Sequence, residues 1–551
     1  MLDYANDMDR LPQRALLKSL GVFGEDLQKP VVGIVMCADG LTPGQAHLKK
    51  LAECAALGVW KAGGLPVNLN VGAANPLLAL GHHGSNFMLP QRELVADSLE
   101  GIITAYGLDA LVLLPDSPGT AAGMLMAAAR KNTPAVVLPG GNTSSKIVDG
   151  QKVKFASIVQ SLCNFKAGAL SLSALEPLEN SLSSDGTIHS IYQTETFFMV
   201  LEALGFSLPD ACCIPGGDPD RLKLAKDSGA AAVTAFEKQI TPARLLTRQG
   251  VKNALTAGFA LGATANSLLN LRALAAEAKA SALKDLTPEA MNLLADKTPK
   301  LCSLFPYSAH MADDFYRAGG VRALLAALSA AQLVATDAIN ISGDELSAVL
   351  PAADDGNEVI RSVKNAYMPN SGVCFLKGNL AEESAFADYS LMPQKSLLKH
   401  GVCKVFDSEE EAVMGIMSGT VRKNTFLVVR GEGPRGGPGM RELLYVFIAL
   451  KAAKLDDSVT LITDGRVPGT TAGGVISLCA PEAVTGGLIA GLKDGDTVEM
   501  DIPRKKLAVK LSAREVDGRM RKPRVTQKEL SGWLSRYANS VSAVGKGCVL
   551  E

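Results

Sequence analysis

Short apolar segments alternate with longer helical patterns in the first 140 residues, and this alternation restricts the possible folds more than any other feature. Val31–Met36 is apolar and rich in β-branched residues, and a helical pattern follows from the turn Thr42-Pro43-Gly44 to about Lys61. The rhythm continues with expected strands at Val67–Val71, Ala110–Leu114 and Pro134–Pro139, and expected helices at Leu94–Tyr106 and Ala121–Lys131. Such alternation, at intervals of about 25–35 residues, is typical of parallel sheets with helical crossovers. The sequence therefore predicts an α/β fold with an N-terminal, doubly wound parallel-sheet domain.

The loops that leave these strands are the expected place for a ligand. In doubly wound sheets, ligands bind outside the carboxyl ends of the strands. The loops in question span residues 37–44, 115–120 and 139–145.

The second half of the chain has a different character. Residues 150–345 are mostly helical in pattern, with amphipathic stretches at 192–205, 252–283 and 320–334. From about residue 375 the apolar runs are shorter and glycine is frequent, which favours strands. The expected strands lie in residues 373–380, 403–408, 425–433, 458–465, 496–503 and 506–512. We therefore expect two domains, residues 1–365 and residues 366–551, the second of them β-rich.

Composition excludes several classes of partner. The 551 residues include 55 basic and 56 acidic side chains, for a net charge of -1, so the chain lacks the basic excess that nucleic acids or membrane surfaces attract. It has no apolar stretch near the ~20 residues of a membrane span, and its N-terminus has no apolar signal region. The ten cysteines are scattered without C-x-x-C spacing, which favours reduced thiols in a cytoplasmic protein.

Two glycine-rich loops follow expected strands of the second half. The first, Gly431–Met440, contains Arg435, and the second runs from Thr463-Asp464-Gly465-Arg466 to Gly469–Gly474. Such loops present backbone N–H groups to an anion, although they serve as readily as simple turns. The sequence leaves both interpretations open.

The two loops, together with other segments, carry a family resemblance. GEGPRGGPGMREL, TDGRVPGTTAGG, APEAVTGG and DGDTVEMDIPRKKL are similar to motifs of the dihydroxy-acid dehydratase and 6-phosphogluconate dehydratase family. In the first half the similar segments are LTPGQAHLKKLAE, GSNFMLPQRELVADSLE, GMLMAAARKNTPAVVLPGG, EALGFSLP and DDFYRAGGV. The resemblance implies an N-terminal α/β domain, a C-terminal domain with a β-barrel, and a cytosolic homodimer or homotetramer. It also implies that water is removed from a dihydroxy acid or sugar acid.

The resemblance further implies a catalytic apparatus that this chain matches poorly. The family uses an iron–sulfur cluster, a Mg²⁺ ion and a serine base. Gly44, Ser117 and Ile188 stand at the three cluster cysteines, and Pro468 stands at the serine. None of Gly, Ser or Ile is a normal cluster ligand. We therefore expect no iron–sulfur cluster, and either a different divalent metal (Zn, Mn, Fe or Mg) or none.

Three family positions bear on such a metal. Pro118 falls at the metal-binding aspartate, although a gap of two residues places Asp116 there instead. His83 replaces a metal-binding glutamate, whereas Glu432 retains another. Two imidazoles and one carboxylate suit a divalent ion, and histidines also serve as metal-free acids and bases. The expected metal ligands are Glu432, His83 and His189.

The leading hypothesis is therefore a divergent hydro-lyase-like enzyme with a remodelled His/Glu site. It would act on a small hydroxy acid or sugar acid, meaning a carboxylate or polyol substrate. The candidate catalytic residues are His83, His189, Ser117, Asp116 and His47. The candidate substrate-binding residues are Thr42, Ser85, Arg435, Asp464, Arg466, Thr470 and Thr471.

Two alternatives stay open beside this hypothesis. A non-catalytic paralogue would keep the scaffold and bind a small ligand or a partner. The second alternative is an ordinary dihydroxy-acid dehydratase.

Overall fold

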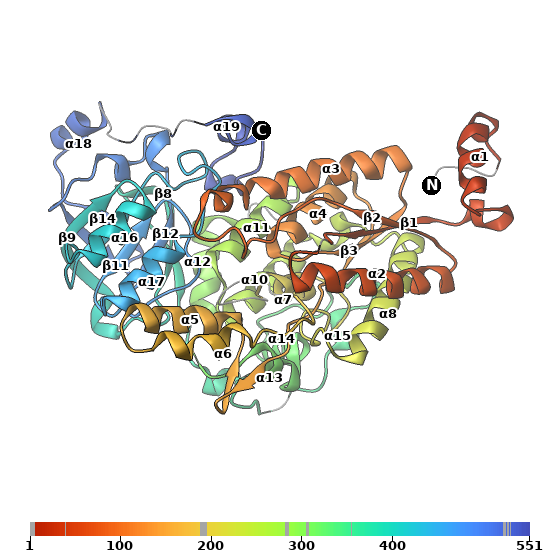
Figure 1. Ribbon diagram of the computed structural model, residues 1–551, viewed down its shortest axis with the longest axis horizontal. Coiled ribbons are helices and arrows are strands. Elements are labelled where there is room, and N and C mark those ends of the chain that lie inside the picture. Colours follow the sequence, from red (N-terminus) through yellow and green to blue (C-terminus); the bar gives the residue numbers. More distant parts are fainter. Residues whose placement is uncertain are drawn as a thin grey trace.

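The computed structural model has an α/β half and a barrel half (Figure 1). It describes residues 6–38, 40–187, 196–281, 286–304, 308–353, 355–521, 525, 528 and 530–551. The predicted Ile188 and His189 lie outside the described residues.

A four-stranded parallel sheet is the centre of the first half. Its order is β2-β1-β3-β4, and all three pairings are parallel. The strands are β1 (Val31–Met36), β2 (Leu65–Asn70), β3 (Ala110–Leu114) and β4 (Ala135–Val137). All residues of β3 and β4 are buried, as expected for a sheet that is covered on both faces. The predicted fold class is thus confirmed.

Helices cover both faces of this sheet (Figure 1). One face carries α2 (Pro43–Lys61) and α8 (Pro219–Glu237), and the other carries α3 (Pro90–Tyr106) and α4 (Pro118–Lys131). Glycines let α2 and α8 approach each other, since a Cβ atom at Gly58 would lie 1.8 Å from the Lys226 carbonyl oxygen. A Cβ atom at Gly229 would lie 2.0 Å from the Ala55 carbonyl oxygen. Close helix contact therefore depends on both glycines.

The segment between sheet and barrel is largely helical, as predicted. The expected stretch 252–283 is divided into two helices, α10 and α11, because Gly262 adopts a left-handed conformation with φ +94°. The remaining elements up to residue 349 are α1 (Leu11–Ser19), β5 (Lys146–Val148), β6 (Gln151–Val153), α5 (Phe155–Lys166), α6 (Glu176–Glu179), α7 (Thr196–Ala203), α9 (Pro242–Leu245), α10 (Arg248–Leu261), α11 (Ala265–Glu277), α12 (Pro288–Lys297), α13 (Ala312–Arg317), α14 (Gly320–Ala330) and α15 (Leu346–Val349).

The second half is built on a closed barrel with the strand order β10-β11-β12-β8-β7-β14-β13-β9. Strands β9 to β12 run parallel to one another in sequence order, and β8 pairs antiparallel with β12. The strands are β7 (Val373–Gly378), β8 (Ala381–Asp388), β9 (Leu398–Phe406), β10 (Phe426–Val429), β11 (Thr460–Thr463), β12 (Val475–Ala480), β13 (Thr497–Asp501) and β14 (Lys506–Val509). The accompanying helices are α16 (Glu409–Met417), α17 (Leu444–Ala452), α18 (Ala513–Met520) and α19 (Gly532–Ser540).

Six of these eight strands were expected from the sequence, whereas β8 and β12 were not. The division of the domains at residue 365 stays a prediction, and the barrel itself begins with β7 at Val373. Nothing in the described part of the chain has the helix length and apolar character that a membrane crossing needs. All ten cysteines have free thiols, and nine of them are buried.

The two halves meet where the 3-10 helix His83–Phe87, just before α3, contacts the first glycine-rich loop. The Asn86 amide nitrogen donates to the carbonyl oxygens of Gly437 at 2.6 Å and Pro438 at 2.8 Å. Gly439 has φ +77°, and a Cβ atom there would lie 2.0 Å from the Asn86 carbonyl oxygen. The backbone of the loop can therefore pack against the N-terminal half only without a side chain at residue 439.

We predict that Gly439→Ala destabilises the protein more than Gly419→Ala. Both glycines are left-handed, with φ +77° and +74°, but a Cβ atom at Gly419 would have no neighbour within 4 Å. Gly419→Ala should cost only the left-handed strain of about 1–2 kcal/mol. Gly439→Ala should add a backbone clash and lower the denaturation midpoint further in urea. Equal midpoints for the two variants would contradict the close contact at the seam.

Candidate active site

A pocket with both polar and apolar lining residues lies between the carboxyl end of β3, helix α11 and the barrel loops. Its empty space is about 740 Å³, counted out to its open mouth. The polar residues among its lining are Ser85, Gln91, Ser117, Asn266, Asn270, Glu442 and Arg466. It therefore lies at the edge of the sheet where doubly wound folds bind ligands.

Ser117 and Asp116 stand at the start of α4, directly after β3. The Ser117 hydroxyl accepts a hydrogen bond from the Thr120 backbone N–H at 3.3 Å and so caps the helix. The buried Asp116 carboxylate accepts from the Thr120 hydroxyl at 2.9 Å and from the Asn75 amide at 3.3 Å. These contacts hold Ser117 at the pocket wall, with Asp116 immediately behind it.

Arg466 enters the pocket from the barrel side. Its Nε atom donates to the Met440 carbonyl oxygen at 2.7 Å, and its Nη1 atom donates to the Asn266 side-chain oxygen at 2.9 Å. Glu442 lies 3.9 Å from Nη1 and accepts a hydrogen bond from the Asn266 amide. Burial lowers the pKa of Arg466, but the group stays cationic. The pocket therefore contains one oriented guanidinium that can bind a carboxylate.

Several lining residues were missed by the sequence analysis. Asn266 and Asn270 stand four residues apart on α11, so they share one face of the helix. Two amide side chains at this spacing in an otherwise apolar helix were the sequence feature that could have indicated these pocket residues. Glu442 lies within a quoted motif, two residues after Met440, but no role was assigned to it.

Neither His47 nor His83 lines this pocket. His82 and His83 are exposed, and His82 caps a short 3-10 helix (His83–Phe87) by accepting the Gly84 N–H. His47 is half-buried on α2, where burial and the nearby Arg221 lower its pKa. Within the described ranges, the His47 Nε2 atom and the hydroxyl of Thr42 at the N-terminus of α2 are both buried with no hydrogen-bond partner.

Glu432 is buried against cations. Arg441 donates to its carboxylate from Nη2 at 3.0 Å and from Nε at 3.2 Å, and the Lys528 Nζ atom lies 3.4 Å away. The protein thus already neutralises this carboxylate. Among the described residues, the one group of three or more metal-capable side chains contains neither Glu432 nor His83.

The glycine-rich loops bind carboxylates of the protein itself. Asp464 accepts from the N–H groups of Gly431, Glu432 and Ala483 at 3.0–3.1 Å. Glu482 accepts the N–H groups of Arg435 and Gly436 at distances between 2.9 and 3.2 Å. The anions that these loop N–H groups bind are therefore carboxylates of the protein itself.

The other candidate binding residues are not part of the pocket lining. The Arg435 guanidinium donates to the Val541 carbonyl oxygen at 2.9–3.0 Å. Thr470 donates to the Asp388 carbonyl oxygen at 2.9 Å, and Thr471 is buried with no hydrogen bond to its hydroxyl. Of the predicted residues, the pocket brings together Ser85, Ser117 and Arg466.

Arg441 also pairs with two neighbouring carboxylates of α16. Glu410 is bound by both terminal nitrogens of Arg441 at 2.7 and 2.8 Å, and this contact lowers the pKa of Glu410 to about 2. Glu409 is buried, lies 3.8 Å from Arg441 and accepts the Tyr445 N–H at 2.7 Å. Burial raises the pKa of Glu409 to about 7. The two adjacent carboxylates therefore have shifts of opposite sign.

We predict that Glu409→Gln flattens the pH dependence of stability between about pH 4.5 and pH 7. A carboxyl whose pKa is higher in the folded state binds more protons there, so stability falls as the pH rises through this range. The glutamine keeps the bond to Tyr445 and removes the titration. Glu410→Gln is the matched control, because a lowered pKa makes stability fall as the pH drops from about 4.5 to about 2. The measurement is the denaturation midpoint of each variant as a function of pH. A change in the same pH range for both variants would contradict the assignment.

The positions that the resemblance assigns to an iron–sulfur cluster do not fit one. Gly44 and Ser117 have no thiol, and Ile188 lies outside the described residues. A Cβ atom at Gly44 would lie 2.9 Å from the Thr187 methyl group. No set of three cysteines gathers within the described ranges. We therefore assign no catalytic step through a cluster.

Two family models together match most of the chain. The model of the N-terminal part of dihydroxy-acid/6-phosphogluconate dehydratases matches residues 29–349. The model of the C-terminal part matches residues 358–548.

Curated relatives match along the whole length. A dihydroxy-acid dehydratase of Caldanaerobacter subterraneus is 38% identical over 99% of this chain and 98% of its own length. Dihydroxy-acid dehydratases of Halothermothrix orenii and Aquifex aeolicus are 37% and 36% identical, over 98% and 99% of this chain respectively and 98% of their own length.

These comparisons correct the leading hypothesis of a divergent enzyme with a remodelled His/Glu site. The full-length relatives are named as dihydroxy-acid dehydratases, which favours the second alternative, the ordinary enzyme. The geometry likewise does not support a site made by His83 and Glu432, since His83 is exposed and Glu432 is paired with Arg441.

The expectation of a protein without an iron–sulfur cluster, with another divalent metal or none, also conflicts with the comparisons. The relatives are named for the activity that the resemblance links to the cluster. We withdraw that expectation, and with it the description of the site as one that has lost its cluster. Gly44 and Ser117 have no thiol to bind a cluster, so the iron and sulfide content of the protein needs to be measured. The matched models and the full-length relatives show that this chain belongs to the dihydroxy-acid/6-phosphogluconate dehydratase family.

Proposed function

We propose that the chain is an ordinary dihydroxy-acid dehydratase, a hydro-lyase that converts a small 2,3-dihydroxy acid into a 2-keto acid and water. The observation that carries this proposal is the identity of 36–38% along whole dihydroxy-acid dehydratases. In the reaction the C3 hydroxyl and the C2 proton leave as water, and the enol that remains tautomerises to the keto acid.

The substrate carboxylate would bind Arg466. Two hydrogen bonds, to Met440 and Asn266, fix the guanidinium before a ligand arrives, so little rotamer entropy is lost on binding. The Nη2 atom makes no hydrogen bond within the described part of the chain and is available to a carboxylate oxygen. Charge-assisted pairing of this kind is about twice as strong as a neutral hydrogen bond.

The substrate hydroxyls would lie toward the opposite wall. Ser85 and Ser117 line that side, and their hydroxyls both donate and accept hydrogen bonds. Asn270 lies beside them, oriented by the Arg92 guanidinium at 3.3 Å. A carboxylate at one end and hydroxyl contacts at the other suit a short dihydroxy acid.

We predict that Arg466→Lys lowers kcat/KM about 10- to 100-fold for a short 2,3-dihydroxy acid. The lysine keeps the charge but loses the planar fork that binds Met440 and Asn266. The measurement is keto-acid formation by anaerobically purified protein, with iron and sulfide determined on the same sample. Arg519→Lys is the control, since Arg519 pairs with Asp496 on the barrel surface, away from the pocket.

The outcomes of this assay differ in meaning. Turnover that Arg466→Lys reduces and Arg519→Lys leaves unchanged supports the proposal, and iron with matching sulfide would identify a bound cluster. Dihydroxy-acid binding without turnover would favour the non-catalytic paralogue. The absence of both binding and turnover would refute the proposal.

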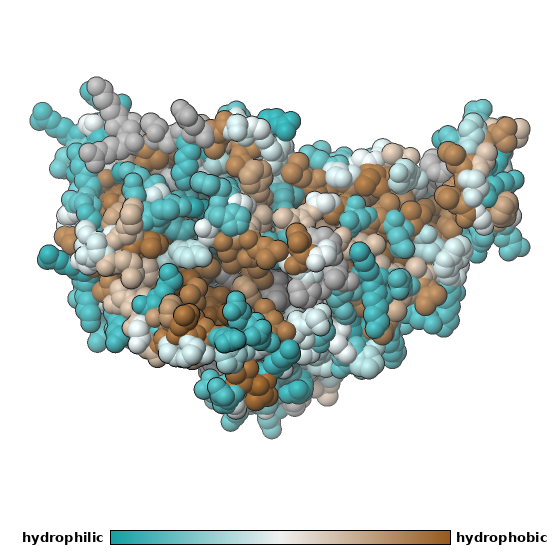
Figure 2. Space-filling model, in the orientation of Figure 1, coloured by the Kyte–Doolittle hydropathy of each residue, from teal (hydrophilic) through white to brown (hydrophobic). Residues whose placement is uncertain are grey.

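We also propose a cytoplasmic homo-oligomer, either a dimer or a tetramer. The free thiols of all ten cysteines suit a reducing compartment. Helix α1 extends from the body, and Figure 2 shows apolar side chains on this extension. Leu16 is 69% exposed and Leu20 is 80% exposed. Apolar side chains on an extended arm are suited to contact a second copy of the chain.

We predict that the double substitution Leu16→Lys with Leu20→Lys reduces the molar mass measured by light scattering. Both side chains are largely exposed in the single chain, so folding of the protomer should be unaffected. Leu293→Lys, at a leucine that is 65% exposed on α12, is the control and should leave the mass unchanged. A wild-type protein that is monomeric at micromolar concentration would contradict the proposal.

A further inference from the structure

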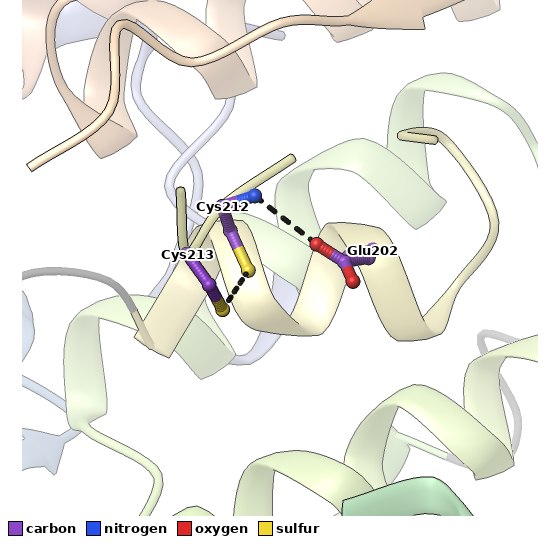
Figure 3. A group of neighbouring side chains, drawn as sticks. All are labelled: Glu202, Cys212 and Cys213. Carbon is purple, nitrogen blue, oxygen red and sulfur yellow. Dashed lines mark hydrogen bonds between the residues drawn. The ribbon is translucent and has the colours of Figure 1, made fainter. Parts of the chain in front are cut away.

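We propose that Glu202, Cys212 and Cys213 bind one Zn²⁺ ion that stabilises the fold, at a site separate from the pocket. Their ligand atoms all lie within 4.8 Å of one another, and all three side chains are buried (Figure 3). The proposal concerns stability and is independent of the proposed function.

The three residues come from a short stretch of chain. Glu202 lies in the last turn of α7, and the two adjacent cysteines follow in the segment after this helix. The Glu202 carboxylate accepts the N–H groups of Asp210 at 2.8 Å and Cys212 at 3.1 Å. These bonds fix the segment against the helix, so the ligands are in place before an ion binds.

The sulfur atoms already face each other. The Sγ atoms of Cys212 and Cys213 are 3.2 Å apart. Tetrahedral zinc with Zn–S bonds of ~2.3 Å separates two thiolates by ~3.8 Å. The pair therefore needs to open by only about half an ångström, a shift within reach of side-chain rotation.

The surrounding charge favours a divalent, thiophilic cation. Two thiolates and one carboxylate carry three negative charges, and the Arg221 guanidinium lies close enough to interact with all three. This guanidinium is fully buried and is fixed by the carbonyl oxygens of Pro139 at 3.0 Å, Ala211 at 2.6 Å and Ile214. One divalent ion with Arg221 balances the three anions. Thiolate ligands select Zn²⁺ over Mg²⁺ or Ca²⁺.

Without an ion, the surroundings shift these residues toward their neutral forms. Burial raises the pKa of Glu202 to about 7 and raises the pKa of Cys212 well above its usual value. The hydrogen bond from Cys212 lowers the pKa of Cys213, but burial and the nearby Glu202 and Asp210 carboxylates together raise it more, so the net shift is upward. Metal binding would therefore release protons, and the affinity would increase with pH.

A small cavity adjoins the group at Glu202. It is lined by Glu202, Gly205, Ser207, Pro209, Arg322 and Asn340, among others. A solvent molecule in this cavity would be the fourth ligand that a tetrahedral zinc site needs.

The test is cobalt and zinc binding by the full-length protein after chelation and reduction. We expect one equivalent of Co²⁺ per chain, with the near-ultraviolet absorption of thiolate–cobalt bonds, and its displacement by Zn²⁺. Cys212→Ser, Cys213→Ser and Glu202→Gln should each weaken binding about 10- to 100-fold. Cys374→Ser, at a buried barrel cysteine outside the group, should bind like the wild type. Circular dichroism establishes that each variant is folded.

Three results would overturn the proposal. They are the absence of the thiolate–cobalt band, a band that persists in Cys213→Ser, and a Cys212–Cys213 disulfide that persists after reduction. Iron and sulfide that remain in Cys213→Ser belong to the reaction site and bear on the proposed function alone.

Discussion

A single buried carboxylate, that of Asp464, organises the part of the barrel that faces the pocket. It follows β11 and accepts N–H groups from the loops after β10 and after β12, so it joins the carboxyl ends of three adjacent parallel strands. A buried carboxylate without such donors would cost several kcal/mol, which makes the three bonds a strict requirement on loop geometry. Because Arg466 lies two residues after Asp464, this arrangement also fixes where the guanidinium enters the pocket. The residues of this family motif therefore serve first to hold the loops in position, and the placement of the guanidinium follows from that.

The pocket forms where an edge of the N-terminal sheet packs against the loops of the barrel. The sheet contributes Ser117 at the start of α4, and the barrel contributes Arg466, whose hydrogen bond to Asn266 crosses from the barrel to α11. The contact of Gly439 with Asn86 fixes the distance between these edges. Neither half forms the site alone, so small shifts at the seam would alter the separation of Arg466 and Ser117. Rigid placement of this kind is what substrate orientation requires.

Local pattern predicted the elements well where burial is uniform. Strands β1 and β3 and helix α2 match their expected ranges, because a fully buried strand reads as an unbroken apolar run and α2 begins at a proline turn. Strand β8 was missed, since Glu382 and Glu383 are exposed on the barrel surface and break the apolar run. The pocket residues Asn266 and Glu442 were missed for another reason. They are 176 residues apart in sequence and meet only through the packing of α11 on the barrel loops.

Packing between segments far apart in sequence also explains why Glu432 and Glu202 differ in their surroundings. Both are buried glutamates, and sequence position alone marked Glu432 as the metal ligand. In the structure Glu432 is bound by Arg441 and lies near Lys528, so its negative charge is already balanced and a cation would have to displace both. Glu202 accepts the backbone N–H groups of Asp210 and Cys212, and it adjoins two thiols that share the nearby Arg221 guanidinium with it. A divalent ion at Glu432 would create an excess of positive charge, whereas at Glu202 it would complete the balance. Availability of a carboxylate to metal therefore depends on the cations that the fold brings to it.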